Sequence, residues 1–183
     1  MLGLGTASQR PDAGSLATLP TEQAPAIDLA TPLVVREIPS AEIAADLFRR
    51  KFAQDIPDFP KHFVAMAGDL CAGYVHYTPW QGDYLCGGLC IDDRVYRALG
   101  SEARAWIRER GGIAEIMMRG AHESLRDAAA IWGYIGDKQA EAVDRRVGFV
   151  PVAEPYLFAI WQKPLSDEAK AARIAEAVKL GPF

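Results

Sequence analysis

Two glycines, Gly111 and Gly112, interrupt the chain immediately before a helical pattern that starts at Ile113. The first amides of a helix have no acceptor inside the helix, and the positive end of the helix dipole lies beside them. Glycine has no side chain, so an anion such as a phosphate can approach the backbone closely at this turn. We therefore predict an anion site formed by the amides of Gly111, Gly112, Ile113 and Ala114, with added positive charge from Arg108 and Arg110.

Two acidic residues oppose this prediction. Glu109 beside a diphosphate would repel it, and at ~4 Å and an effective dielectric of ~20 one such pair costs ~4 kcal/mol. Glu115 falls at the third helical position if Gly112 is the N-cap, and there its carboxylate can reach back to a free amide. The alternative interpretation of this loop is therefore a helix start that caps itself and needs no ligand.

Groups that could accept a proton are spread over several segments. Asp92 and Asp93 follow a predicted strand that ends at Ile91, and His76 lies within a predicted hairpin. Glu154 is a further carboxylate near the C-terminal strands. For Asp92 the alternative explanation is a solvated turn carboxylate, and for His76 it is a structural strand histidine.

Length and composition narrow the classes of protein. The 183 residues suit a single domain at the usual ~150 residues per domain. A net charge of −4 leaves no basic field for a phosphate backbone, so nucleic acid is not expected as the main partner. No apolar run reaches the ~20 residues of a membrane-spanning helix, and the N-terminus does not resemble a signal peptide. We therefore expect no membrane partner and a cytoplasmic location.

The number of cysteines also favours a cytoplasmic location. Cys71, Cys86 and Cys90 are an odd number and too few for a disulfide framework, which indicates a reducing compartment. Cys86 and Cys90 lie on a predicted strand, where a four-residue separation places them ~13 Å apart. No four-ligand set is completed around them, so we expect no metal.

The first part of the chain predicts a tail, a strand, a helix and three further strands. Residues 1–30 are rich in Ala, Thr, Ser and Pro, and we interpret them as a mobile tail that precedes a domain over residues 31–165. A strand at 33–38 and a helix capped by Ser40 follow. A hairpin turns at Gly68–Asp69, and a third strand, 84–91, contains Gly87–Gly88, which suggests a bulge or a close ligand.

The second part alternates helices and strands. The pattern predicts helices at 101–110, 113–125 and 138–147, the last capped by Asp137 and ended by Gly148. It predicts strands at 128–135, 149–152 and 157–161. Ser166 caps a closing helix that packs on the domain over 166–183. The helix 101–110 has three interpretations: a cover over a ligand cleft, a packing element, or a dimer contact anchored by Trp106. The order describes a mixed α/β fold.

From about Pro32 to Lys163 this order resembles the GNAT superfamily of acyl-CoA-dependent N-acyltransferases. The resemblance is carried by residues 62–73, by Gly112-Ile113-Ala114 at a helix start, and by residues 137–149, which end in Gly148-Phe149. It implies a mixed, mainly antiparallel sheet flanked by helices, with acetyl-CoA or another acyl-CoA as cosubstrate. In that family the glycine loop holds the coenzyme A pyrophosphate, and its pattern begins with Arg or Gln, where this chain has Glu109.

The resemblance also implies how the reaction is assisted. In the family, backbone amides of the strand before the glycine loop, here Cys86 to Ile91, polarise the thioester carbonyl. The proton donor is often a tyrosine four residues before the glycine of the Gly-Phe pair, and Asp144 stands at that position. An aspartate has no proton to give at pH 7 unless burial raises its pKa. The candidate catalytic residues are therefore Asp92, Asp144 and His76.

Three functions follow from these features. The first is transfer of an acyl group from acyl-CoA to an amine on a small molecule or a protein. The second is a catalytically silent module that binds acyl-CoA or a protein partner, which Glu109, Glu115 and Asp144 favour. The third is cysteine chemistry with His76 as the base, although strand alternation places Cys71 and His76 on opposite faces.

Overall fold

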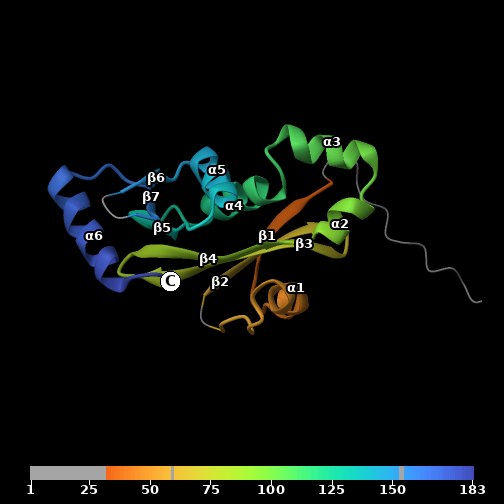
Figure 1. Cartoon of the computed structure of the whole chain (residues 1–183), viewed down its shortest axis with the longest axis horizontal. Coiled ribbons are helices and arrows are strands. Elements are labelled where there is room, and N and C mark those ends of the chain that lie inside the picture. The colour runs from red at the N-terminus through yellow and green to blue at the C-terminus, as the bar shows by residue number, and fades with distance from the viewer. Residues whose placement is uncertain (1–31, 59, 153–154) are drawn as a thin grey trace, which may run out of the picture.

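The computed structural model describes residues 32–58, 60–152 and 155–183. Within them a seven-stranded sheet has the order β1-β2-β3-β4-β5-β7-β6, and six helices flank it (Figure 1). All neighbouring strands are antiparallel except β4 and β5, which are parallel. The predicted mixed, mainly antiparallel sheet is confirmed. The tail predicted over residues 1–30 lies outside the described residues, which contain no helix long and apolar enough to cross a membrane.

The first five elements follow the sequence pattern closely. They are β1 (Val34–Ile38), α1 (Glu42–Phe52), β2 (Lys61–Ala67), β3 (Leu70–Trp80) and β4 (Asp83–Ile91). Gly68 and Gly82 have positive φ at the two hairpin turns, as tight turns require. The predicted cap of the first helix is displaced by one residue, because Ala41 and not Ser40 is the N-cap.

The remaining elements include one helix that the sequence did not predict. They are α2 (Asp93–Ala98), α3 (Ser101–Glu109), α4 (Ile113–Glu123), β5 (Ala130–Tyr134), α5 (Lys138–Val147), β6 (Val150–Pro151), β7 (Leu157–Trp161) and α6 (Asp167–Leu180). The unpredicted helix is α2, none of whose residues is buried, so it carries no apolar periodicity. The predicted caps Asp137 and Ser166 each accept a backbone amide, and Gly148 ends α5 with φ 111°.

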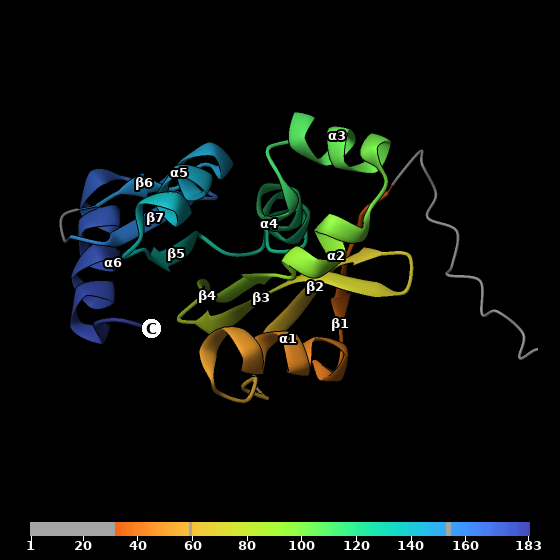
Figure 2. The same ribbon diagram turned by 45° about the vertical axis from the view of Figure 1, so that its right-hand side comes forward.

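The central strands separate two layers of helices. Phe63 and Ala65 on β2 belong to the apolar cluster beneath α4, whereas Val64 and Met66 pack with α1 on the other face. Figures 1 and 2 show α1 on one side of the sheet, with α4 and α5 on the opposite side. Alternation along a strand therefore decides which layer a side chain faces.

A bulge changes this alternation between β2 and β3. Met66 pairs with Cys71, but Ala65 pairs with Gly73, so Ala72 is the additional residue on β3. Cys71 consequently packs with Met66 in the α1 layer. The ring of His76 also lies in this layer, beside Phe48 of α1. Cys71 and His76 therefore face the same layer, and the prediction that these two residues lie on opposite faces is wrong.

The strands β4 and β5 part after a short parallel pairing. Only Tyr84–Cys86 pair with Ile131–Gly133, whereas β4 continues to Ile91 along β3. At the point of parting, β4 bulges opposite Val75, and Gly88 has φ 61°. The bulge predicted at Gly87–Gly88 is confirmed, and the sheet is left with a V-shaped gap between the two strands.

The helix α6 is tied to the sheet through a buried carboxylate. Asp83, 2% exposed, accepts hydrogen bonds from the Ala130 amide (2.9 Å), the indole of Trp132 (3.0 Å) and Arg173 of α6 (2.7 Å). A buried charge needs such partners, because its desolvation is costly. Asp83 therefore joins the β3–β4 hairpin, β5 and the C-terminal helix.

We predict that Asp83→Ala lowers the free energy of unfolding by about 3–5 kcal/mol, because it leaves a guanidinium and two N–H groups without their acceptor. The measurement is urea unfolding followed by tryptophan fluorescence. Glu176→Ala, which removes a surface ion pair with Lys179, is the matched control and should cost under about 1 kcal/mol. Equal losses in the two variants would contradict the prediction.

Candidate functional site

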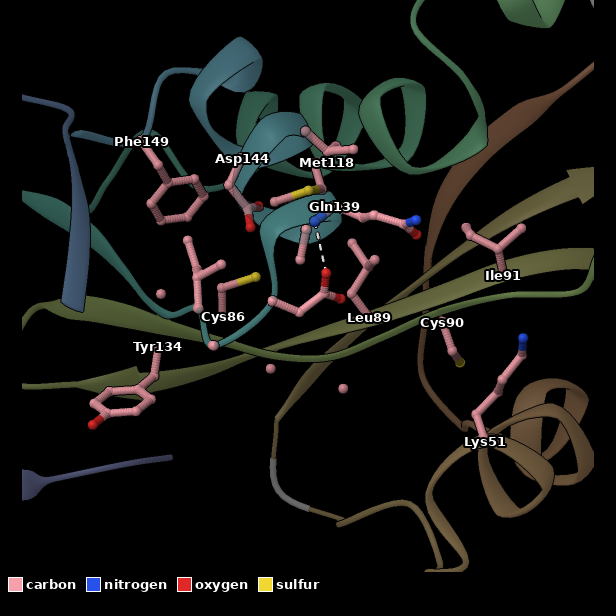
Figure 3. A pocket seen from close by; sticks show the side chains of 18 of the residues that line it. Lys51, Cys86, Leu89, Cys90, Ile91, Met118, Tyr134, Gln139, Asp144 and Phe149 are labelled. Atoms are coloured by element: carbon pink, nitrogen blue, oxygen red, sulfur yellow. Dashed lines mark hydrogen bonds between the residues drawn. The ribbon is translucent and has the colours of Figure 1, made fainter. Parts of the chain in front are cut away.

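The gap between β4 and β5 opens into a cavity of about 570 Å³ (Figure 3). Helices from both layers contribute to its wall: Lys51 and Phe52 from α1, and Met118, Gln139 and Asp144 from α4 and α5. The strand β4 supplies every residue from Cys86 to Ile91. The cavity thus lies where the sheet is interrupted and is lined from both faces.

Asp144 is the buried acid of this cavity. It projects from α5 toward β4, above Cys86 (Figure 3), and the residue is 9% exposed. Burial raises the pKa of its carboxyl to about 7. Proton donation by an aspartate at pH 7 requires a pKa raised by burial, and Asp144 has one. It therefore retains a proton in a large share of molecules at neutral pH.

Asp92 lies at the head of α2 and outside the residues that line the cavity. Its carboxylate accepts from Arg94 (2.8 Å) and from Arg50 (2.9 Å). The hydrogen bonds from Arg94 hold the pKa of Asp92 well below its usual range. A carboxylate so occupied caps a helix, so the geometry gives no support to its predicted role as a base. Glu154, the further candidate, lies outside the described residues.

His76 is not among the residues that line the cavity, but on the α1 side it lies directly against two of them. Its ring packs against Gly87 and Gly88, two lining residues, and a Cβ on Gly87 would come within 2.8 Å of its Nε2. Burial, with a smaller contribution from His62, lowers the pKa of His76 to about 4. The imidazole is therefore neutral at pH 7 and carries a free lone pair.

The glycine loop differs from its prediction. The Gly111 amide donates to Arg108 (3.1 Å) and the Gly112 amide donates to Ile107 (2.9 Å). Both glycines have positive φ, the conformation that closes a preceding helix. The prediction of open amides at these two positions is wrong, because they satisfy the last carbonyls of α3. In the described part of the chain, no backbone acceptor is found for the amides of Ile113 and Ala114.

Glu115 lies directly over this loop. A Cβ added to Gly111 would come within 2.0 Å of its carboxylate, which accepts from Arg119 and from Arg146 at 2.8 Å each. Burial would raise the pKa of Glu115, but these guanidiniums outweigh it and hold the pKa below its usual value. The alternative of a self-capped helix is wrong in its predicted form, because among the described residues the donors to Glu115 are arginines and not amides.

The predicted arginines are only partly available. Arg108 is exposed, whereas Arg110 stacks on Trp106 at 4.0 Å and donates to its carbonyl. Ala103 and Ile107 of α3 are buried in the core, and no described residue of α3 lines the cavity. Of the three interpretations of this helix, packing is confirmed, and its position gives no support to a cover over this cavity.

The cavity and the start of α4 are nevertheless neighbours. Ile91, the predicted cofactor contact at the end of β4, lines the cavity. A Cβ on Gly73 would meet both Ile91 (2.9 Å) and Ile113 (3.2 Å), so these two side chains share one small space. The far end of the cavity therefore lies close to the open amides of Ile113 and Ala114.

Sequence reasoning missed several residues of the wall. Met118, Gln139 and Phe183 come from three separate segments, and nothing in their local pattern distinguishes them. Cys86 also lines the cavity, but burial raises the pKa of its thiol to about 12, and that of Cys90 to about 12 as well. Burial likewise raises the pKa of Cys71. Cysteine chemistry needs a thiolate, so these thiols give it no support.

Comparisons with protein-family models and with curated proteins found no match. Solved structures share the fold. A ribosomal-protein-alanine N-acetyltransferase from Escherichia coli aligns with a TM-score of 0.53 at 9% identity, over 74% of this chain and 97% of that one. IAA acetyltransferase from Bacillus cereus aligns with a TM-score of 0.51 at 14% identity, over 70% of this chain and 99% of that one. A GNAT-family protein from Desulfovibrio desulfuricans aligns with a TM-score of 0.51 at 13% identity, over 72% of this chain and 99% of that one. The chain has the GNAT fold.

We predict that Asp144→Asn stabilises the protein at pH 8 but not at pH 4. The folded state keeps a proton on Asp144 up to about pH 7, whereas an unfolded aspartate loses it near pH ~4. The folded state therefore binds more protons in this window, and stability falls as the pH rises through it. Urea unfolding should give the variant an advantage of up to about 4 kcal/mol at pH 8.

The control for this prediction is Asp69→Asn, which neutralises an exposed carboxylate in the hairpin turn. The difference in unfolding free energy between each variant and the natural chain reports the substituted carboxyl alone, because the histidines titrate in both proteins. A gain for Asp144→Asn that is the same at both pH values would contradict a raised pKa at this site.

Proposed function

We propose that the protein is an N-acyltransferase that moves an acetyl or other acyl group from acyl-CoA to an amine on a small molecule or a protein. The observation that carries the proposal is the cavity at the parting of β4 and β5, with the buried acid Asp144 facing it. The acetyltransferases named above share the fold, which supports the same reaction class. A fold by itself does not define an activity, so the argument depends on the site.

The residues present fit an acyl-CoA in two places. Among the described residues, no strand pairs with the edge of β4 from Gly87 to Ile91 on the β5 side, so the main-chain groups of this edge could bind an extended acyl-pantetheine chain. The amides of Ile113 and Ala114, with Arg108 nearby, would hold the diphosphate. Acyl-CoA supplies a thioester, whose acyl carbon is open to attack and whose sulfur leaves as a thiolate.

The protein assists this chemistry in three ways. Main-chain amides on the free edge of β4 stabilise negative charge on the carbonyl oxygen as the amine attacks. Asp144 holds a proton on its carboxyl and gives it to the leaving sulfur, which balances the proton lost by the amine. Apolar side chains around the gap, such as Leu89 and Met118, keep water away from the reacting atoms.

One observation favours binding without turnover as the second candidate. The Gly111 and Gly112 amides are occupied, and the Glu115 carboxylate lies over Gly111, so the diphosphate would meet fewer donors and one negative charge. Weak binding or a non-productive pose would follow from such repulsion. Binding of acetyl-CoA without release of free thiol across a panel of amines would support this candidate and contradict catalysis.

We predict that the natural protein releases free thiol from acetyl-CoA in the presence of an acceptor amine. In the Asp144→Asn variant, kcat should be about 100-fold lower, with little change in the KM for acetyl-CoA. The asparagine is similar in size but cannot donate an acidic proton. Thiol release is followed with a disulfide dye, and kcat of the natural protein should fall as the pH rises above about 7. Unchanged kcat in the variant would exclude Asp144 as the acid.

We predict that Glu115→Gln tightens acetyl-CoA binding about 10-fold, because it removes a negative charge beside the proposed diphosphate site. S-acetyl-pantetheine, which has no diphosphate, should bind the variant and the natural protein equally well. Calorimetry with both donors, at low and high salt, makes the comparison. Equal effects on the two donors would place the diphosphate away from the start of α4.

A further inference from the structure

We propose that His62, Tyr74 and His76 form a proton relay that carries the proton of the acceptor amine away from the cavity to His62, on the α1 side of the sheet. The inference rests on the proposed function, since it assigns the base of that reaction. It concerns the face of the sheet opposite Asp144. The proton therefore enters the reaction from one face and leaves it on the other.

The three side chains form one hydrogen-bonded chain, in which Tyr74 and His62 are buried and His76 is half-buried. The Tyr74 hydroxyl lies 2.8 Å from Nδ1 of His62 and 3.3 Å from Nδ1 of His76. Tyr74 is 0% exposed and His62 is 5% exposed, and Phe48 of α1 packs edge-on against the Tyr74 ring. The register of β2 and β3 places His62 directly opposite His76, so the backbone fixes the spacing of the chain.

At its His76 end the chain packs against two residues that line the cavity, Gly87 and Gly88. A Cβ on Gly87 would lie 2.8 Å from Nε2 of His76, and one on Gly88 would lie 2.6 Å from its Nδ1. Any larger residue at these positions would collide with the imidazole. The two glycines thus let Nε2 come up to the strand edge along which the amine and the thioester would meet.

The hydrogen bonds define a direction for the proton. A phenol donates one hydrogen, so one histidine accepts it at Nδ1 and the other must donate from Nδ1. We assign the shorter contact to donation by Tyr74, which leaves an N–H on Nδ1 of His76 and a lone pair on its Nε2. Nε2 then takes the amine proton, Nδ1–H passes a proton to Tyr74, and Tyr74 passes its own to Nδ1 of His62.

The neighbouring charges explain why a relay is needed. Burial lowers the pKa of His76 to about 4, so it cannot hold the proton by itself. Burial also lowers the pKa of His62, but the Asp58 carboxylate acts in the opposite direction and makes His62 the better receiver. Burial raises the pKa of Tyr74, with Cys90 of β4 adding to it, so the hydroxyl remains protonated between transfers. From α1, Lys51 is the charged neighbour at the cavity.

The first test is independent of activity. Nitrogen-15 NMR of the histidine rings reports which nitrogen carries hydrogen. The relay requires the N–H of His76 on Nδ1 and that of His62 on Nε2, and Tyr74→Phe should abolish this preference for His76. The opposite tautomers in the natural protein would overturn the relay and leave the transferase proposal intact.

The second test separates proton transfer from packing. Tyr74→Phe should lower kcat about 100-fold while the KM for acetyl-CoA stays within twofold. His62→Gln keeps an oxygen that accepts from Tyr74 but cannot pass a proton on, so it should lose as much activity. A merely structural role would leave His62→Gln close to the natural protein.

His122→Gln is the matched control, because His122 is also hydrogen-bonded to a strand tyrosine, Tyr77, but in the other layer. It should keep kcat within twofold. If the natural protein is active and Tyr74→Phe and His62→Gln remain as active as this control, the relay is wrong. If the natural protein transfers no acyl group to any amine, the proposed function and the relay both fail.

Discussion

The parting of β4 and β5 is the constraint on which the rest of the site depends. Two parallel strands that pair over only Tyr84–Cys86 and Ile131–Gly133 leave the remainder of β4 with main-chain groups that need other partners. The side chains of α4 and α5 approach the gap from one layer and those of α1 from the other. A ligand with an extended backbone of its own would satisfy these groups.

The electrostatics of the site follow from how deeply each charge is buried. Burial raises the pKa of Asp144 to about 7, so its carboxyl keeps a proton in a large share of molecules at neutral pH, whereas the two arginines around Glu115 keep that carboxylate charged. Asp92 is held in the same way by Arg94 and Arg50. These three buried acids thus have different chemistry, and it is the Asp144 carboxyl that faces the cavity with a proton to give.

Features set by neighbouring residues were predictable from the sequence. The hairpin glycines, the caps at Asp137 and Ser166 and the end of α5 at Gly148 depend on local conformation, and they are confirmed. The short helix α2 was missed because its apolar contact with the core is limited to the half-buried Val95 and Tyr96. The Gly111–Gly112 loop was interpreted only as the start of α4, although a glycine directly after a helical pattern is also a signal for the end of that helix.

The relay was beyond sequence reasoning for a different reason. Continuing the register of Met66 with Cys71 would pair His62 with Val75, and the two histidines would then not face each other. The single extra residue Ala72 shifts the pairing so that His62 lies opposite His76. The burial of Asp144 likewise depends on strands and helices that meet only in the folded chain.

The contact between His76 and the Gly87–Gly88 pair has an evolutionary consequence. Because the imidazole occupies the space where a Cβ at either position would stand, the residues at 76 and 87 cannot change independently. A descendant that acquired alanine or serine at 87 would have to replace the histidine by something narrower. The identity of the strand glycines is thus dictated by a partner on the adjacent strand, and the two sites should vary together across related chains.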